Sequence, residues 1–127
     1  MSDGYGILRV QKIKKSSWGE IRGRLMHATR EFQDGSRTGP ETAKALANLR
    51  AMLGEVTSER SDAVGSLEIV ITSTADVLSL EDQKKFLADG LKWVADEFKE
   101  KNIFGTYLHD DEKVLHLHVF VCPREWK

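Results

Sequence analysis

Apolar residues recur along the chain at two spacings, every second position and every third or fourth, and these spacings distinguish strands from helices. Four segments with alternating or β-branched apolar residues predict strands: Tyr5–Ile13, Leu67–Thr74, Ile103–His109 and Leu115–Val121. Three stripes at helical spacing predict helices, which begin after Ser17, Pro40 and Ser79 and end near Phe32, Leu53 and Asn102. With no internal repeat and no linker, this order of elements predicts a single domain over residues 1–127.

The first helix begins with a capping box, Ser17-Trp18-Gly19-Glu20, in which the serine hydroxyl and the glutamate satisfy free backbone donors. Its apolar stripe faces the core and comprises Trp18, Ile21, Leu25, Ala28 and Phe32. The opposite face includes Arg24 and His27, and Arg30 lies one turn from His27. The pattern predicts an imidazole on the polar face with basic neighbours.

Three of the four histidines lie within ten residues, in the last two predicted strands. Side chains two positions apart share a face of a strand, so His116 and His118 point to one side, away from the leucines and valines of the same strand. If His109 pairs with His116 in a hairpin, Tyr107 lies opposite His118, and three imidazoles come within reach of one point. The same register places three further residues on the apolar face: Phe104, Thr106 and Leu108.

Neutral imidazoles together with a carboxylate are the donors that Zn²⁺, Mn²⁺ and similar divalent ions select. We therefore interpret the three hairpin histidines as ligands of such an ion. Glu112, three residues after His109, is the acid expected at the metal or beside it, whereas Asp110 and Asp111 are typical turn formers. Single histidines are commonly structural, so His27 by itself indicates little.

Composition and charge point to a globular protein with one basic region. The chain has 127 residues, of which 40% are hydrophobic and 31% charged, and its formal net charge is −1. Residues 1–37 hold eight Lys or Arg against four acids, whereas the remaining 90 residues hold 11 against 16. A basic third in an otherwise acidic chain favours contact with a polyanion, although an ordinary solvated surface gives the same count.

The chain shows no sign of a membrane or secretory segment. No stretch has the run of about 20 apolar residues that a membrane-spanning helix needs. The first residues lack the basic start and apolar run of a secretory signal, and the single Cys122 fits a reducing compartment. We therefore expect a cytoplasmic protein without membrane contact.

The hairpin motif resembles that of the Mob/Pre family of plasmid mobilisation relaxases, a branch of the HUH (His-hydrophobe-His) endonucleases. The family pattern is His-x-Asp-Glu-x-x-Pro-His-x-His followed by a proline. This chain has His109-Asp110-Asp111-Glu112, then His116-Leu117-His118 and Pro123, with Leu115 where the family has a proline. The first strand and the His27-Ala28-Thr29-Arg30 segment are similar to the family's opening strand and its His-x-x-Arg motif.

The resemblance implies an α+β fold, in which an antiparallel sheet of about four strands has helices packed on one face and the metal site on the other. It implies a relaxase that nicks and rejoins DNA by transesterification through a covalent protein–5′-phosphate intermediate, in plasmid mobilisation and DNA recombination. Relatives continue beyond the motif, so the chain resembles a short member that lacks their C-terminal extension.

The resemblance also implies a role for each site residue. His109, His116 and His118 are expected to hold a divalent ion, Mn²⁺ or Mg²⁺ with Zn²⁺ as an alternative. Glu112 is expected to ligate the metal or to orient the nucleophile. His27 is the expected nucleophile, with Tyr107 as the alternative because other HUH enzymes use tyrosine. The residues expected to contact single-stranded or hairpin DNA, similar to an origin of transfer, are Arg9, Lys12, Lys14, Arg24 and Arg30.

Two other functions stay open. A truncated, inactive relative would bind DNA through its basic face without cutting it. A metal hydrolase unrelated to DNA would use the same three histidines, although the basic region and the His27-x-x-Arg30 motif favour the relaxase. A covalent protein–DNA adduct separates a relaxase from a DNA-binding remnant, and salt-sensitive binding to single strands separates both from a hydrolase.

Overall fold

The computed structural model describes residues 6–14, 16–29, 40–54, 64–73, 79–109 and 115–123. All four predicted strands and all three predicted helices are present, with ends within a few residues of the prediction where they are described. In chain order the elements are β1 (Gly6–Lys14), α1 (Trp18–Thr29), α2 (Thr42–Leu53), β2 (Val64–Ser73), α3 (Leu80–Phe98), a 3₁₀ turn (Glu100–Asn102), β3 (Ile103–His109) and β4 (His116–Val121). No helix among the described residues is long and apolar enough to cross a membrane.

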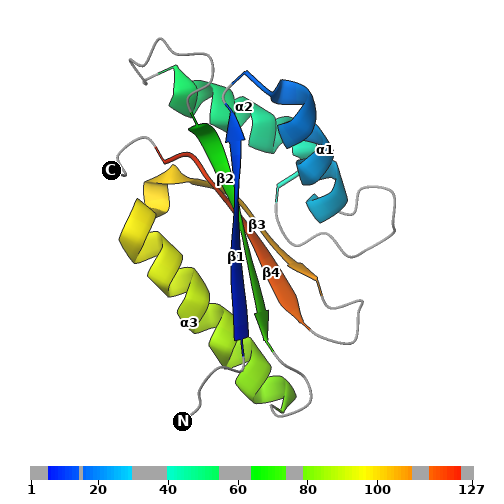
Figure 1. Ribbon diagram of the computed structural model, residues 1–127, viewed down its shortest axis with the longest axis vertical. Coiled ribbons are helices and arrows are strands. Elements are labelled where there is room, and N and C mark those ends of the chain that lie inside the picture. The colour runs from blue at the N-terminus through cyan, green and yellow to red at the C-terminus, as the bar shows by residue number, and fades with distance from the viewer. Residues whose placement is uncertain are drawn as a thin grey trace.

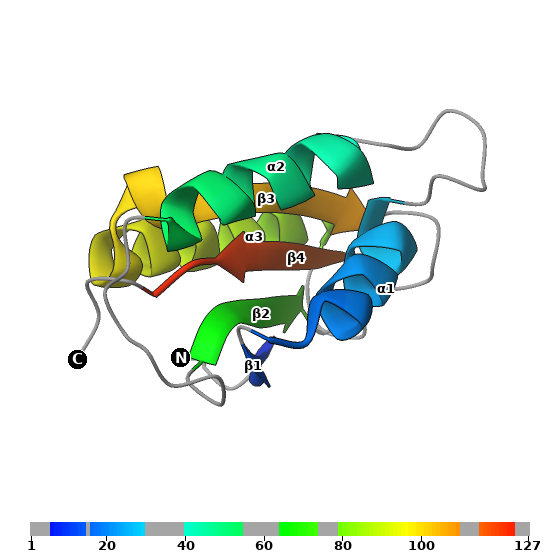
Figure 2. The ribbon, with the colours of Figure 1, turned by 90° about the horizontal axis from the view of Figure 1, so that it is seen from above.

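The strands form one antiparallel sheet in the order β1-β2-β4-β3, which Figure 2 shows from above. The α+β class and the four-stranded antiparallel sheet are therefore confirmed. β3 and β4 pair as the sequence predicted, with His109 opposite His116 and Tyr107 opposite His118. This pairing places the histidines of both strands on one face of the sheet.

The helices lie on both faces of the sheet, rather than on the single face that the resemblance implied. Leu117, Val119 and other residues of β4 pack with α3 in one apolar cluster. Phe120 packs with α1 and α2 in a second cluster on the opposite face. Figure 1 shows the sheet between α3 and the pair formed by α1 and α2. The reason is that β4 is buried along almost its whole length, and a strand with two apolar faces needs a cover on each.

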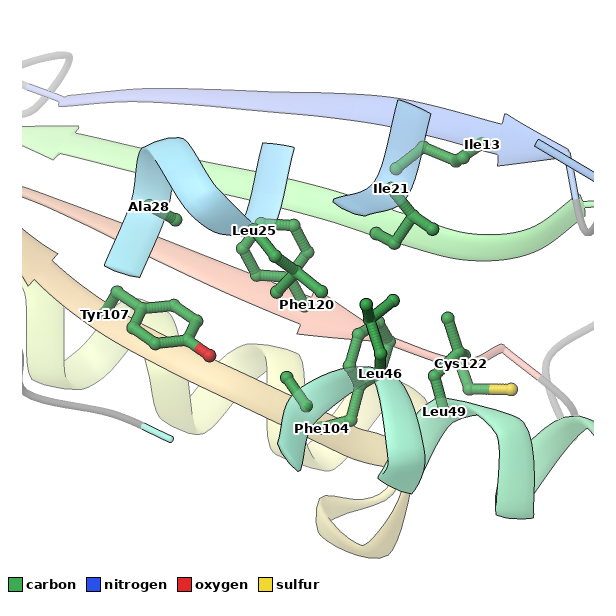
Figure 3. Close-up of a cluster of buried hydrophobic side chains, with 11 residues drawn as sticks. Ile13, Ile21, Leu25, Ala28, Leu46, Leu49, Phe104, Tyr107, Phe120 and Cys122 are labelled. Atoms are coloured by element: carbon green, nitrogen blue, oxygen red, sulfur yellow. The ribbon is translucent and has the colours of Figure 1, made fainter. Parts of the chain in front are cut away.

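The apolar stripe of α1 holds this helix against the end of the sheet that carries the histidines. Ile21, Leu25 and Ala28 are buried, as predicted, while Phe32 lies outside the described residues. Figure 3 shows Leu25 and Ala28 beside Tyr107 and Phe120, with α2 completing the cluster. The burial of this stripe leaves the polar face of α1, which carries His27, turned away from the core.

One residue of the hairpin lies on the face opposite to its prediction. The register shifts between Ile103 and Gly105, so that Phe104 is an extra residue relative to β4. Phe104 consequently packs in the cluster beneath α1 and α2, with its ring 5.9 Å from that of Phe120. Leu108 lies beyond the bulge and packs on the α3 side, as predicted.

The third helix begins at its predicted cap and covers the sheet face opposite to the histidines. The backbone N–H of Asp82 donates to the side-chain oxygen of Ser79 at 3.1 Å, which satisfies a free donor of the first turn. Leu87, Val94 and Phe98 are buried against β2 and β4. This side of the sheet is therefore apolar core, and the three hairpin histidines lie on the other side.

Candidate metal and DNA site

The three hairpin histidines meet on the sheet face that carries α1. His109 and His116 are direct partners across β3 and β4, and His118 follows two residues later on β4. The rings of His109 and His118 have centroids 4.2 Å apart, and one potential ligand nitrogen from each of the three lies within 4.8 Å of the others. We call these three residues the histidine trio. Three imidazole nitrogens at such separations are a donor set for a divalent ion.

Hydrogen bonds orient two rings of the trio. Nε2 of His109 lies 2.8 Å from the carbonyl oxygen of Ala28 in α1, and Nδ1 of His118 lies 2.8 Å from a carboxylate oxygen of Glu68 in β2. Both oxygens only accept, so these nitrogens carry the proton in the neutral rings, and the lone pairs are on Nδ1 of His109 and Nε2 of His118. Rings held in this way by outer partners are typical of metal ligands, and the trio fits such an ion.

Glu68 is the site residue that the sequence reasoning missed. The side chain is buried, and its second carboxylate oxygen accepts a hydrogen bond from Nη1 of Arg24 at 2.9 Å. Burial by itself would raise the pKa of Glu68, but the hydrogen bonds from His118 and Arg24 outweigh it and lower the pKa below its usual value. A glutamate inside the apolar segment Leu67–Thr74 was the available signal, because a buried charge needs partners.

His27 is exposed in the last turn of α1 and lies next to the trio. Its ring centroid is 6.1 Å from that of His109 and 6.3 Å from that of His118. The hydrogen bond between Ala28 and His109 ties the adjacent backbone of α1 to the hairpin. Packing of α1 therefore brings together two motifs that are far apart in the sequence.

A groove of about 780 Å³ lies between β1 and α1, and both His27 and His118 line it. Arg9, Gln11, Glu20 and Arg24 also line this groove. The guanidinium of Arg24 is held between two carboxylates, with Nε 3.2 Å from Glu20 and Nη1 2.9 Å from Glu68, and about a third of the side chain is exposed (34%). The groove thus combines imidazole, basic and acidic side chains, and it lies beside the histidine trio.

The basic residues predicted to bind DNA divide between the two faces of β1. Arg9 pairs with Val70, which pairs with His118, so Arg9 is on the groove side. Lys12 pairs with Leu67, a residue of the α3 cluster, and is therefore on the opposite side. The two side chains therefore do not share one surface of β1, because residues an odd number of positions apart in a strand point to opposite faces. Their contact with DNA stays a prediction. Lys14 is exposed beyond a register shift and does not line the groove.

Tyr107, the alternative nucleophile, is buried in the apolar cluster beneath α1 and α2. It lies opposite His118 as predicted, but the residue is only 1% exposed and its hydroxyl donates to the carbonyl oxygen of Pro40 at 2.7 Å. Figure 3 shows its ring within the apolar cluster. Its ring makes an edge contact with Phe120, with centroids 5.9 Å apart. A buried hydroxyl that donates to a carbonyl is not presented to a DNA strand, whereas His27 is exposed; the identity of the nucleophile stays a prediction.

Two predicted site residues, Arg30 and Glu112, lie outside the described residues, as do the predicted turn formers Asp110 and Asp111. The choice between Glu112 as a ligand and as an orienting base therefore stays a prediction, as does the contact of Arg30 with DNA.

Strand β4 of the antiparallel sheet carries His116-Leu117-His118, the His-hydrophobe-His motif that gives the HUH class of DNA-processing proteins its name. The model of the Mob/Pre family, described as plasmid recombination enzyme, matches residues 38–127. This match covers most of the chain, and the chain therefore belongs to the Mob/Pre family.

The chain is similar along most of its length to curated plasmid recombination enzymes. It is 25% identical to one from Bacillus sp., over 94% of this chain and 33% of that protein. The identity is 28% to the type 1 enzyme of Staphylococcus aureus (94% of this chain, 34% of that protein) and 31% to an enzyme of Bacillus thuringiensis (94% and 30%). The chain spans about a third of the length of these relatives.

The fold matches crystal structures of the MobM relaxase domain. One of them holds Mn and oriT DNA of plasmid pMV158, and it superposes with a TM-score of 0.73 at 25% identity over 94% of this chain and 71% of that domain. Another, bound to 26 nucleotides of the same oriT, gives a TM-score of 0.66 at 26% identity over 96% and 71%. These matches confirm the relaxase-like fold predicted from the motifs.

Proposed function

We propose that this chain is a relaxase domain that binds single-stranded DNA and cuts and rejoins it with the help of a divalent metal ion, in the cytoplasm, during plasmid mobilisation and recombination. The observation that carries the proposal is the convergence of His27 with the histidine trio at a groove that also contains Arg9 and Arg24. The relatives' names and the DNA-bound MobM domain support it.

The histidine trio is the proposed metal site. When bound, a divalent ion polarises a non-bridging phosphate oxygen and stabilises the charge that grows in the transition state. Three imidazoles favour Mn²⁺ or Zn²⁺ over Mg²⁺, because Mg²⁺ prefers oxygen donors. Mn is the ion in the MobM domain.

His27 is the proposed nucleophile. A neutral imidazole attacks through a nitrogen lone pair, so a P–N bond forms while the bond from phosphorus to the 3′-oxygen breaks. The 3′-oxygen takes up a proton and becomes a hydroxyl, and the ring loses its remaining N–H proton to water. The product is a 5′-phosphohistidine that holds one DNA end, and attack by the 3′-hydroxyl reverses the step and rejoins the strand.

The groove between β1 and α1 is the proposed path of the DNA backbone. Arg9 is exposed there, and backbone phosphates are the groups that such a cation attracts. Gly19 and Gly23 also line the groove, and a Cβ on either would meet no atom within 4 Å. This part of the helix surface has no side chains, so a strand can approach the α1 backbone closely.

The metal site is tested by calorimetric titration of the purified chain with Mn²⁺ and with Zn²⁺. We expect one ion per chain and loss of the signal in His116→Ala, since two imidazoles hold an ion more weakly than three. Circular dichroism of both proteins shows that the variant is folded. A folded wild-type chain that binds neither ion would contradict a metal-dependent reaction and leave DNA binding as the remaining function.

Strand cleavage is tested with a library of single-stranded oligonucleotides labelled at the 3′ end and incubated with Mn²⁺. Because the enzyme keeps the 5′-phosphate side of the break, the label should remain on the protein band after denaturation. His27→Ala should form no adduct. The bond should be lost in acid, in which a phosphohistidine hydrolyses and a phosphotyrosine survives. Salt-sensitive DNA binding without any adduct would identify the chain as a DNA-binding remnant.

A further inference from the structure

A line of hydrogen-bonded charges connects the surface of α1 with the histidine trio. Glu20 on α1 binds Nε of Arg24 at 3.2 Å, Nη1 of Arg24 binds one oxygen of Glu68 at 2.9 Å, and the other oxygen binds Nδ1 of His118 at 2.8 Å. The exposure falls along this line, since the side chain of Glu20 is 42% exposed and that of Glu68 only 7%. Glu68 thus links Arg24 of α1 to His118 of the trio through its two carboxylate oxygens.

The register of the sheet explains why a glutamate is needed at this place. His118 is the direct partner of Val70, and Glu68 is the direct partner of Phe120, so Glu68 and His118 are diagonal neighbours on one face. Diagonal Cα atoms of adjacent strands are about 7–8 Å apart, a distance that only long side chains bridge. The carboxylate of Glu68 reaches the ring at 2.8 Å, and the carboxylate of an aspartate would be set back by one methylene.

We propose that Glu68 is a positioning residue that holds the His118 ring in the Nδ1–H form with Nε2 directed into the trio, and that Arg24 holds Glu68 for this task. This inference rests on the proposed function, in which the trio binds a divalent ion. The buried carboxylate accepts the Nδ1 proton of His118, so the lone pair that a metal requires is on Nε2. Arg24 anchors the carboxylate from the other side and keeps its second oxygen satisfied.

Arg24 has a different role here from the DNA contact that the sequence suggested, because it binds Glu68. An arginine on the polar face of a helix was expected to contact the DNA backbone. The two carboxylates already neutralise its charge and fix its guanidinium, so its main task is internal. Arg9 is then the more effective cation for phosphates in this groove.

The first test is a measurement on the metal-free protein. Long-range ¹H–¹⁵N NMR spectra distinguish the two neutral forms of a histidine, and we expect His118 of the wild-type chain to be the Nδ1–H form. Glu68→Gln should shift a substantial part of it to the Nε2–H form, because His118 and Arg24 donate to different oxygens of Glu68 and an amide keeps an oxygen at only one of these two positions. Glu20→Gln is the matched control: it makes the same chemical change on another partner of Arg24 and should leave His118 unchanged.

The second test is Mn²⁺ titration of the same three proteins. Loss of an outer partner of a metal-binding histidine costs about 10- to 100-fold in affinity. We therefore expect Glu68→Gln to bind Mn²⁺ at least about tenfold more weakly than the wild type and Glu20→Gln to stay within about twofold. If Glu68→Gln does not fold, Glu68→Asp keeps the charge in a similar volume and should show the same loss through its shorter reach.

The outcomes separate this inference from the proposed function. A wild-type chain that binds Mn²⁺, together with a Glu68→Gln variant of equal affinity or with an unchanged His118, overturns the positioning role alone. A folded wild-type chain that binds no Mn²⁺ overturns the metal-dependent function and this inference with it. Equal losses in Glu20→Gln and Glu68→Gln would assign the effect to the removal of a negative charge near the site instead of to the contact with His118, and would also overturn the proposal.

Discussion

Removal of the Tyr107 hydroxyl tests whether this tyrosine stabilises the fold or attacks the DNA. The hydroxyl lies in the core beneath α1 and α2 and donates to the carbonyl oxygen of Pro40 at 2.7 Å, just before α2 begins. Tyr107→Phe keeps the ring and its edge contact with Phe120 and deletes the hydroxyl that donates to Pro40. The expected result is a less stable chain that still forms the DNA adduct.

The expected loss in the free energy of unfolding follows from the surroundings of this hydrogen bond. A hydrogen bond between neutral groups contributes about 0.5–1.5 kcal/mol to stability. Pro40 is half-buried, so water can replace part of the lost interaction, and we expect a loss of about 1 kcal/mol. For a domain of this size, such a loss lowers the melting temperature by about 4 °C.

Denaturant unfolding followed by circular dichroism gives the free energy of unfolding, and the 3′-labelled DNA assay gives the adduct. Tyr5→Phe, at the only other tyrosine of the chain, is the matched control for the substitution. Unchanged stability would refute the structural role of the hydroxyl. A Tyr107→Phe protein that is folded at the assay temperature and forms no adduct would refute the assignment of His27 as nucleophile.

Three further predictions concern the core, the helix α1 and the DNA path. Gly105→Ala should destabilise the chain by about 1–3 kcal/mol in thermal unfolding, because the new Cβ would lie 2.8 Å from Cε2 of the buried Tyr107; an unchanged melting temperature would contradict this packing. Gly23→Ala should stabilise it by about 0.5–1 kcal/mol in denaturant titration, because Gly23 is inside α1 and its Cβ would meet no neighbour; a loss of stability would be inconsistent with the open groove. Arg9→Ala should weaken the binding of single-stranded DNA and reduce the slope of log affinity against log salt by about 0.7. Lys12→Ala, on the other face of β1, should change both quantities less. Equal effects would rule out the groove as the DNA path.

The elements and the hairpin register were predictable because they depend on residues close together in the chain. The cap at Ser79, the apolar stripe of α1 and the pairing of His109 with His116 all follow from local periodicity and short turns. The histidine trio followed from the same register, since a strand has only two faces. The bulge at Phe104 did not follow, because a single extra residue is set by how both faces of β4 pack.

The sequence by itself therefore determined the helices, the strands and the sheet face that the three hairpin histidines share, and the tertiary structure decided which other side chains lie beside them. Burial of the α1 stripe brings His27 to the trio, and the order of the strands places Glu68 beside His118, a residue 50 positions away. The same packing buries Tyr107 and puts Arg9 and Lys12 on opposite sides of the sheet edge. Contacts between elements far apart in sequence depend on which faces pack together, and no local pattern specifies them.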